Sequence, residues 1–275
     1  MNRREANEQL AAQLLQARDA VRLAANPSHF GFDLTVGRGY QIGRALHERL
    51  VSRGLKPFGR KIGFTNRSMW EQFKVSEPIW AHVYEQTVHF AQEGNLRLSL
   101  AGMVAPRIEP EIVLRLRSAM PSGELSVEEL ATCIEWAAVG LEIVDTHFAD
   151  WRFNAAEAVA DFGLHAALVV GPPWRVDSEA PNHLAAVLES LRVTLRGSND
   201  LVAEGEGRNA LGGPLLALGF LARVLSTQPW AGPLMPGEVI TTGTLTAFPY
   251  VQHGGLYRVE VVGAPLAPLQ LELGE

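Results

Sequence analysis

Residues 107–116 read RIEPEIVLRL, an apolar run with strand-like alternation that nevertheless carries two carboxylates. Side chains alternate along a strand, so Glu109 and Glu111 share one face, with Cα atoms about 7 Å apart. Pro110 stands between them, and proline within a strand favours an edge or a bulge. The stretch therefore predicts a β-strand with two like charges on one side and apolar residues on the other.

A pair of like charges on a partly buried strand face needs compensation, because the two groups repel each other and lose hydration. A hard divalent cation such as Mg²⁺ provides it, since it takes oxygen ligands. Glu142 lies in another strand-like run and would complete a cage of three carboxylates if the two strands are neighbours. The alternative is a solvated strand face, on which Glu109 and Glu111 pair with nearby arginines and Glu142 is an unrelated surface residue.

The composition is that of an ordinary globular protein with room for a large core. The chain has 275 residues, of which 47% are hydrophobic. Its net charge of -6 comes without a block of like charges, so nothing indicates a nucleic-acid partner. Cys133 is the only cysteine, which excludes an intrachain disulfide and favours a reducing compartment. Without a signal-like N-terminus or an apolar run of roughly 18 residues, we expect a cytoplasmic protein with no membrane partner.

The sequence changes character after Gly54. Residues 3–24 and 36–53 have apolar positions at helical spacing, which predicts a helical N-terminal lobe over residues 1–56. Short strand-like runs separated by glycine and proline follow, and they predict a strand-rich second domain over residues 57–275.

Two helices are expected within this strand-rich part. The first begins with a capping box formed by Ser126 and Glu129 and continues through Ile134 and Ala137. The second begins at Pro214, since proline is favoured at the first helical position. The regular alternation of a doubly wound sheet is missing. The predicted fold is therefore α+β, with a mixed β-sandwich or barrel-like roll behind the small helical lobe.

Four stretches together resemble the fumarylacetoacetate hydrolase superfamily, most of all its branch of 2-keto-4-pentenoate hydratases and 4-oxalocrotonate decarboxylases. They are GRKIGFTN at 59–66, RIEPEIVLRL at 107–116, GLEIVDTHFADWRF at 140–153 and PGEVITTGTLTAF at 236–248. They follow the family order and span nearly the whole chain. The resemblance implies a metal-dependent hydratase or decarboxylase that acts on a small 2-oxo or 2-hydroxydienoic acid in aromatic catabolism. It also implies a homo-oligomer.

The same resemblance implies roles for individual residues. Glu109, Glu111 and Glu142 would hold one Mg²⁺ or Mn²⁺ ion. Lys61, in the motif G-x-K-x-G, would lie near the substrate carboxylate and the developing enolate. The TTGT stretch that ends at Thr244 could offer hydroxyl and backbone N–H groups to a carboxylate, or could simply form the turn at the end of a strand.

The sequence departs from the family pattern at the presumed substrate wall. Ile79 stands where many hydratases have an acidic residue for proton transfer, and Phe162 replaces an asparagine. Both side chains are expected to contact the substrate. His82, Glu77 and His165 are the candidate replacements for the missing acid or base, and for the histidines a structural or surface role is the alternative.

Several other residues and functions stay open. Three polar residues after Glu142 are candidates for supporting contacts or for loop capping: Asp145, His147 and Asp150. Three tryptophans are expected in the core rather than at a ligand: Trp70, Trp80 and Trp151. One alternative function is C–C hydrolysis of an acylpyruvate, which needs a histidine and glutamate pair to activate water. Another is a metal-binding paralogue that has lost its acid/base group.

Overall fold

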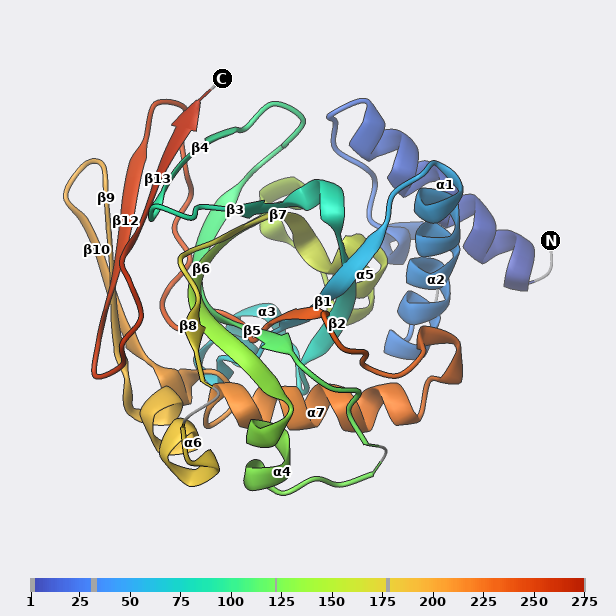
Figure 1. Ribbon diagram of the computed structural model, residues 1–275. Helices are drawn as coiled ribbons and strands as arrows, with labels where there is room; N and C mark the ends of the chain where they lie inside the picture. The colour runs from blue at the N-terminus through green and yellow to red at the C-terminus, as the bar shows by residue number, and fades with distance from the viewer. Residues whose placement is uncertain (1–2, 31–33, 122, 177–178, 275) are drawn as a thin grey trace.

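A curled eight-stranded sheet forms the centre of the protein (Figure 1). The computed structural model describes residues 3–30, 34–121, 123–176 and 179–274. The strand order is β2-β1-β11-β5-β6-β7-β3, with β8 paired to β6. The strands are β1 (Pro57–Gly63), β2 (Ile79–Tyr84), β3 (Val88–Phe90), β5 (Arg107–Leu116), β6 (Ile134–Val144), β7 (His165–Val170), β8 (Trp174–Arg175) and β11 (Val239–Thr241).

A second, five-stranded sheet lies beside the curled sheet, on the side opposite helices α1 and α2 (Figure 1). Its order is β10-β9-β12-β13-β4. Its strands are β4 (Asn95–Ser99), β9 (Arg192–Gly197), β10 (Leu201–Glu206), β12 (Leu256–Val262) and β13 (Leu269–Gly274). Both sheets contain parallel and antiparallel pairs, which confirms the predicted α+β fold with a mixed, barrel-like roll.

Helices cover the rims and the outer faces of this arrangement. They are α1 (Arg3–Asp19), α2 (Val36–Ser52), α3 (Trp70–Phe73), α4 (Val127–Thr132), α5 (Ala155–Ala160), α6 (Pro181–Ser190) and α7 (Pro214–Ser226). Helix α7 begins at Pro214 as predicted. The stretch Gly207–Ser226 is long and apolar enough to cross a membrane by length and composition. Its α7 part, however, buries Leu218, Leu221 and Leu225 in the main core.

Strand β5 separates the main core from the candidate site. Ile108, Ile112 and Leu114 are fully buried in the main core, as their alternation predicts. Glu109 and Glu111 lie on the opposite face of the strand. The central position of β5, between β11 and β6, places these carboxylates inside the protein and not on a solvated edge.

The predicted helix through Ile134 and Ala137 is wrong beyond its first turns. The capping box is present, because the backbone N–H of Ser126 donates to Glu129 and the Ser126 hydroxyl accepts from the N–H of Glu129. The helix nevertheless ends at Thr132, and β6 begins at Ile134. β6 is paired on both sides, and this sheet context outweighs the helical spacing of its apolar residues.

The N-terminal helices pack on the rest of the protein through α5. Helix α2, whose N-terminus is capped by the Thr35 hydroxyl, contacts both α1 and α5. The buried cluster of these helices also includes Tyr84, Phe148 and Ala160. The predicted boundary between residues 56 and 57 therefore stays a prediction, although the helical lobe itself is present.

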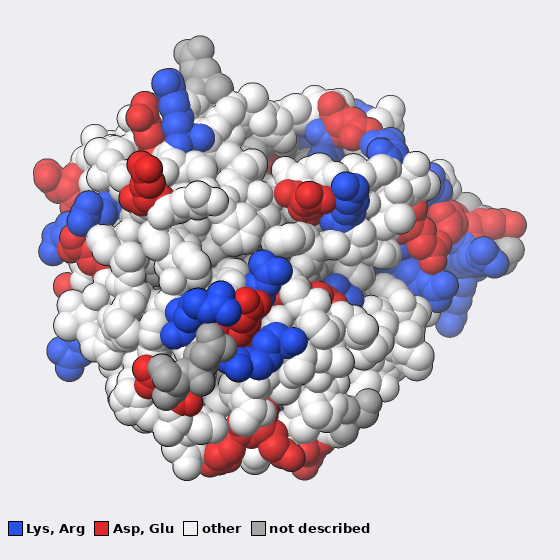
Figure 2. All heavy atoms as spheres, in the orientation of Figure 1, with Lys and Arg blue, Asp and Glu red and all other residues white. Residues whose placement is uncertain are grey.

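Basic and acidic side chains lie next to one another on the face drawn in Figure 2. Elsewhere among the described residues, ion pairs such as Arg49–Glu8 at 2.7 Å and Arg53–Asp19 at 2.8 Å also bring the two signs together. Wide uncharged areas separate the charged groups in the view. The described residues on this face form no broad surface of one sign.

Candidate active site

Three carboxylates meet where β5 and β6 run side by side. Glu109 pairs with Glu142 in the antiparallel register, and Glu111 pairs with Gly140. Each glutamate offers one oxygen, and these oxygens all lie within 4.8 Å of one another. A side chain at residue 140 would crowd this face, because a Cβ atom there would lie 2.5 Å from Val113 Cγ2. The register of two strands thus brings together all three predicted carboxylates.

Lys61 supplies a positive charge to this cluster. It lies on β1, which pairs with β11 beside β5, and its Nζ is 3.1 Å from Glu142 Oε2. Lys61 is only 2% exposed. Burial works against its charged form, but Glu142 and the two other glutamates raise the pKa of Lys61 above its ordinary value. The ammonium group is therefore protonated at neutral pH.

The glutamates themselves have very different proton affinities. Burial, with the charge of Glu142, raises the pKa of Glu109 to about 7 against the opposing effect of Lys61. Burial and the two neighbouring carboxylates raise the pKa of Glu111 well above its ordinary value. Burial also opposes ionisation of Glu142, but Lys61 and His165 lower its pKa. Lys61 and His165 thus favour the ionised form of Glu142, whereas the environment of Glu109 and Glu111 favours their protonated forms.

The oxygen atoms of the cluster suit a divalent cation. Glu111 Oε2 accepts the Gly243 N–H at 2.7 Å, while Glu111 Oε1 has no hydrogen-bond partner among the described residues. The buried Thr241 hydroxyl likewise lacks a partner there. Unpaired buried oxygens are costly. Hard oxygen donors with negative charge are the ligands that Mg²⁺ prefers, and Mn²⁺ accepts the same donors, so the cluster fits either ion.

A cavity of about 490 Å³, including its open mouth, adjoins the cluster. Its polar lining consists of Lys61, Asn66, Glu109 and Thr244. The rest of the lining is apolar or glycine: Gly63, Phe64, Met69, Phe73, Ile79, Val144, Trp151, Phe153, Gly163, Leu164 and Phe248. Among the described lining residues, Lys61 and Glu109 alone are titratable. The cavity therefore has one charged end and one apolar end.

Aromatic rings build much of the apolar end. Phe73 stacks on Phe153 with ring centroids 5.5 Å apart and lies 5.7 Å from Phe248. Trp151 lies 5.6 Å from Phe248; it is buried in a core cluster, as expected, and it also lines the cavity. Its indole N–H donates to the Ala105 carbonyl at 3.0 Å and is thus already satisfied.

Two of the predicted residues lie outside this lining. Side chains alternate along β2, so Ile79 faces the cavity while His82 faces a second cavity, of about 390 Å³. There His82 stacks on His47 at 3.7 Å between ring centroids. Phe162 also lines the second cavity, because the backbone takes φ of 56° there and 61° at Gly163 and so turns the next residues toward the first cavity.

His165 contacts the carboxylate cluster through Glu142. Its Nδ1 is 2.7 Å from Glu142 Oε1, and its Nε2 is 2.8 Å from the Thr87 hydroxyl oxygen. Burial lowers the pKa of His165, against the opposing effect of Glu142. The side chain does not line the first cavity. Glu77, the other candidate acid, and Asp150, a candidate for supporting contacts or loop capping, are both exposed.

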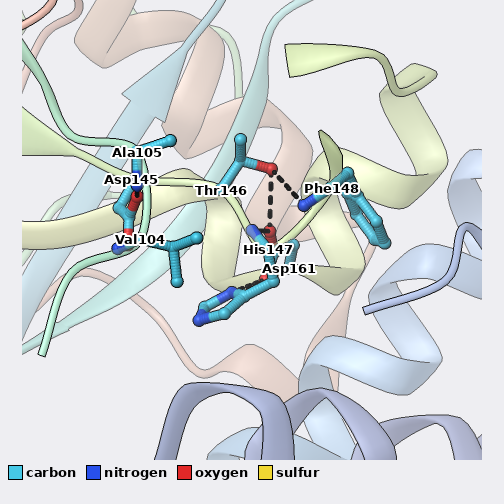
Figure 3. Close-up of polar contacts among 7 residues, drawn as sticks. All are labelled: Val104, Ala105, Asp145, Thr146, His147, Phe148 and Asp161. Carbon is cyan, nitrogen blue, oxygen red and sulfur yellow. Dashed lines mark hydrogen bonds and ion pairs between the residues drawn. The ribbon is translucent and has the colours of Figure 1, made fainter. Parts of the chain in front are cut away.

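Two aspartates brace the loops around the cavity (Figure 3). Asp145 accepts the backbone N–H groups of residues 104 and 105 at 2.8 and 2.7 Å. Asp161, at the end of α5, accepts from the Thr146 hydroxyl at 3.1 Å and from the backbone N–H of His147 at 2.9 Å. His147 Nδ1 lies 2.6 Å from the same carboxylate. These residues support loops and do not contact the three glutamates.

The chain belongs to the fumarylacetoacetate hydrolase family, since the family model for the fumarylacetoacetate (FAA) hydrolase C-terminal region matches residues 65–272. A 4-oxalocrotonate decarboxylase from Pseudomonas sp is 30% identical over 243 residues, which cover 88% of this chain and 90% of that protein. A 2-keto-4-pentenoate hydratase from Paraburkholderia xenovorans (strain LB400) is 28% identical over 256 residues, 93% and 91% of the two chains.

Solved structures show the same fold. The 4-oxalocrotonate decarboxylase from Pseudomonas putida G7, complexed with magnesium and adipate, matches with a TM-score of 0.88 at 21% identity. The match covers 99% of this chain and 98% of that one. The agreement extends to nearly every residue of the chain, including the N-terminal helices.

Sequence reasoning missed some of the residues that shape the cluster. Gly243 lies in the TTGT stretch, which indicated backbone donors for a carboxylate, but its N–H binds the protein's own Glu111. Thr87 carried no signal at all, because a lone threonine in a short turn has no recognisable pattern. Gly243 contacts Glu111 directly, whereas Thr87 is connected to Glu142 only through His165.

Proposed function

We propose that this protein is a metal-dependent lyase of small 2-oxo acids, and that decarboxylation is the reaction its cavity suits best. The observation that carries the proposal is a cavity lined by Lys61 and Glu109 at one end, beside the cluster of three carboxylates, and by an uncharged, largely aromatic wall at the other. Family membership supports it, because the relatives include proteins named 4-oxalocrotonate decarboxylase and 2-keto-4-pentenoate hydratase.

In this proposal Glu109, Glu111 and Glu142 hold one Mg²⁺ or Mn²⁺ ion. When bound, the ion supplies positive charge beside the 2-oxo group and the adjacent carboxylate of the substrate. Lys61 adds a second positive charge at the same end of the cavity, and its protonated Nζ is a hydrogen-bond donor for the 2-oxygen. Thr244 and Ile79 line the cavity and would contact the substrate there.

The apolar wall favours loss of CO₂ from the far end of a substrate such as 4-oxalocrotonate. The bond to the distal carboxylate breaks, CO₂ leaves, and the electron pair passes through the conjugated carbons to the 2-oxygen, where the Lys61 ammonium can deliver a proton. No cation lines the cavity beside Phe73, Phe153 and Phe248 among the described residues, because the guanidinium of Arg107, 4.7 Å from the Phe248 ring centroid, is not part of the lining. A carboxylate in this part of the cavity therefore loses hydration without a paired charge in the lining, whereas CO₂ is uncharged. The wall therefore destabilises the charged reactant relative to its neutral product.

Hydration and C–C hydrolysis fit the same wall less well. Both reactions activate a water molecule beside the carbon chain and therefore use an acid or base in the distal half of the cavity. Ile79 occupies the place where an acidic group is expected in a hydratase, and it is 1% exposed. The described lining residues include no histidine to pair with a glutamate for hydrolysis.

A paired assay tests the reaction. The purified protein with Mg²⁺ is given 4-oxalocrotonate while released CO₂ is measured, and 2-hydroxypenta-2,4-dienoate while loss of its ultraviolet absorbance is followed. An acylpyruvate is the third substrate, and its hydrolysis is followed in the same way. We expect CO₂ release to exceed dienoate loss by at least about tenfold. Dienoate loss alone would favour the hydratase, turnover of acylpyruvates alone the hydrolase, and silence on all three substrates the metal-binding paralogue.

A binding measurement tests the carboxylate cluster separately from catalysis. Glu111→Gln keeps the size of the side chain and removes its charge, so the affinity for Mn²⁺, measured by electron paramagnetic resonance, should fall at least tenfold. Glu204→Gln, at an exposed position on β10, is the control and should bind Mn²⁺ normally. Normal binding by Glu111→Gln would refute the cluster as the metal centre.

We also propose a cytoplasmic homo-oligomer. The single cysteine, Cys133, is buried and free, which suits a reducing compartment. The family resemblance supports the oligomer. Light scattering of the purified protein after size-exclusion chromatography would measure the mass in solution, and a mass of 30.0 kDa would show a monomer.

A further inference from the structure

In each of the two fully buried glutamates, a protein donor holds one carboxylate oxygen. Gly243 N–H donates to Glu111 Oε2 at 2.7 Å, and His165 Nδ1 lies 2.7 Å from Glu142 Oε1. The remaining oxygen of Glu111 has no hydrogen-bond partner among the described residues, and that of Glu142 has the ion pair with Lys61 at 3.1 Å. Each carboxylate thus turns one oxygen away from the cluster and leaves the other available to it.

We propose that His165, held in place by Thr87, is a positioning residue that restricts Glu142 to one metal-binding oxygen and thereby selects Mg²⁺ or Mn²⁺ over Ca²⁺. The inference rests on the proposed metal centre and goes beyond it, because it concerns which ion the centre prefers. It also replaces the acid/base role considered for His165, since that side chain does not line the cavity.

The hydrogen-bond geometry makes His165 a clamp, which here means that the ring holds the Glu142 carboxylate in one orientation. A carboxylate oxygen only accepts, so Nδ1 carries the proton and donates it to Glu142. The opposite ring nitrogen, Nε2, lies 2.8 Å from the Thr87 hydroxyl oxygen, which is also 3.0 Å from the Tyr84 carbonyl oxygen, so the single hydroxyl proton is donated to one of these two acceptors at a time. Glu142 is fully buried and the His165 side chain is 3% exposed, so water does not compete for these bonds.

The clamp matters for ion choice because the two kinds of ion use carboxylates differently. Ca²⁺ takes six to eight oxygens at longer distances and readily accepts both oxygens of one carboxylate. Mg²⁺ demands a compact octahedron and takes carboxylates through one oxygen. A glutamate with one oxygen that accepts a hydrogen bond from a histidine offers only the coordination that the smaller ion needs. Without the clamp, Glu142 could rotate and present both oxygens.

Four variants test the proposal with a readout other than activity. His165→Ala removes the donor, and His165→Asn restores a side-chain N–H near the position of Nδ1. Thr87→Val keeps the shape of Thr87 and removes the hydroxyl that fixes the ring. His183→Ala, on the exposed face of α6, is the control. The affinity of each protein for Mn²⁺ is measured by electron paramagnetic resonance, and those for Mg²⁺ and Ca²⁺ by competition against Mn²⁺.

We expect His165→Ala to bind Mn²⁺ about 10 to 100 times more weakly, the usual effect of losing a group that orients a metal ligand. Its preference for Mg²⁺ over Ca²⁺ should fall by at least about fivefold. His165→Asn should recover most of both quantities, Thr87→Val should show smaller losses in the same direction, and His183→Ala should match the wild type. If His165→Ala does not fold, Thr87→Val and His165→Asn decide the question.

Three results would overturn the proposal. One is unchanged affinities with only a lower melting temperature, which would make His165 merely structural. Another is a lower kcat with unchanged metal affinities, which would make it a catalytic group. The third is weaker Mn²⁺ binding with an unchanged ratio of Mg²⁺ to Ca²⁺ affinity, which would refute the selection. A wild-type protein that fails to bind Mn²⁺ would instead refute the metal centre itself.

Discussion

The ammonium group of Lys61 lies 3.1 Å from Oε2 of Glu142, and both side chains are almost completely buried. A buried ion pair contributes little when both partners are present, but removal of one partner leaves a charge without compensation. Lys61 also faces two further glutamates whose pKa values are raised. The pair therefore links the stability of the metal-free protein to the chemistry of the cavity.

Replacement of Lys61 by methionine should destabilise the metal-free protein by about 3 kcal/mol, because three glutamates lose their nearest cation. Urea denaturation at pH 8 would measure the loss. Lys56→Met is a matched control, since Lys56 is exposed and pairs with Glu85 at 3.5 Å, and it should cost less than about 1 kcal/mol. Equal losses in both variants would contradict the role given to the buried pair. Turnover should fall at least about a hundredfold in Lys61→Met alone.

Gly243→Ala should weaken both the fold and the metal centre. Gly243 has φ of +95°, and a Cβ atom there would lie 1.8 Å from Thr65 Oγ1, so its N–H could not keep its place at Glu111. We expect a loss of at least about 3 kcal/mol in unfolding free energy and weaker Mn²⁺ binding. Gly254→Ala, at φ of +73° with nothing within 4 Å, isolates the backbone strain and should cost about 1 kcal/mol. If Gly243→Ala and Gly254→Ala lose similar amounts of unfolding free energy, the clash with Thr65 is relieved and the prediction is contradicted.

His82 should make the protein sensitive to acid. Burial, with Arg60 and His47 nearby, lowers the pKa of His82 to about 2. Between pH 6.5 and 2 the unfolded chain binds a proton that the folded protein does not, so the stability that this site contributes above pH 6.5 is lost as the pH falls. His82→Phe keeps a ring against His47. As the pH falls below 6.5, the wild-type protein should lose on the order of 1 kcal/mol more stability per pH unit than this variant. Melting temperatures from pH 8 to pH 4 measure this, and parallel curves for the two proteins would contradict it.

Ile79→Asp should shift the reaction toward hydration. The substitution places a carboxyl group in the apolar wall, where it can transfer protons to the distal carbons of the substrate. It should also cost about 2 to 4 kcal/mol in stability, since the site is buried. Ile79→Asn has the same size and polarity without the acid, and it should show the stability loss but no gain in dienoate hydration. Hydration by both variants, or by neither, would count against this role of residue 79.

The sequence indicated the charged end of the site far better than its apolar end. Alternation along a strand is a local property, and it sufficed to put Glu109 and Glu111 on one face. The pairing of β5 with β6 was needed to add Glu142, and the sequence stated it only as a condition. Lys61 followed from its motif. These residues belong to central strands, whose side-chain directions are fixed by the period of two.

The apolar end depends on features with no local signal. Phe162, Gly163 and Leu164 all have positive φ, at 56°, 61° and 65°, and this turn decides which of their side chains face the cavity. Only the glycine is a residue type that indicates such a conformation. The strand β2, which separates His82 from Ile79, was not predicted either. The residues of the cavity walls were therefore predicted from their positions in the family motif, and these positions do not show which way a side chain points.

The braces formed by Asp145 and Asp161 have a mechanical consequence for the cavity. Asp145 anchors the loop that leads into β5, while Asp161 anchors the segment that joins β6 to α5, and residues 145 and 146 are consecutive in the chain. A displacement of either loop therefore pulls on the same short segment. The β5 end of the cavity and the segment after α5 are therefore linked to each other through the backbone of residues 145 and 146.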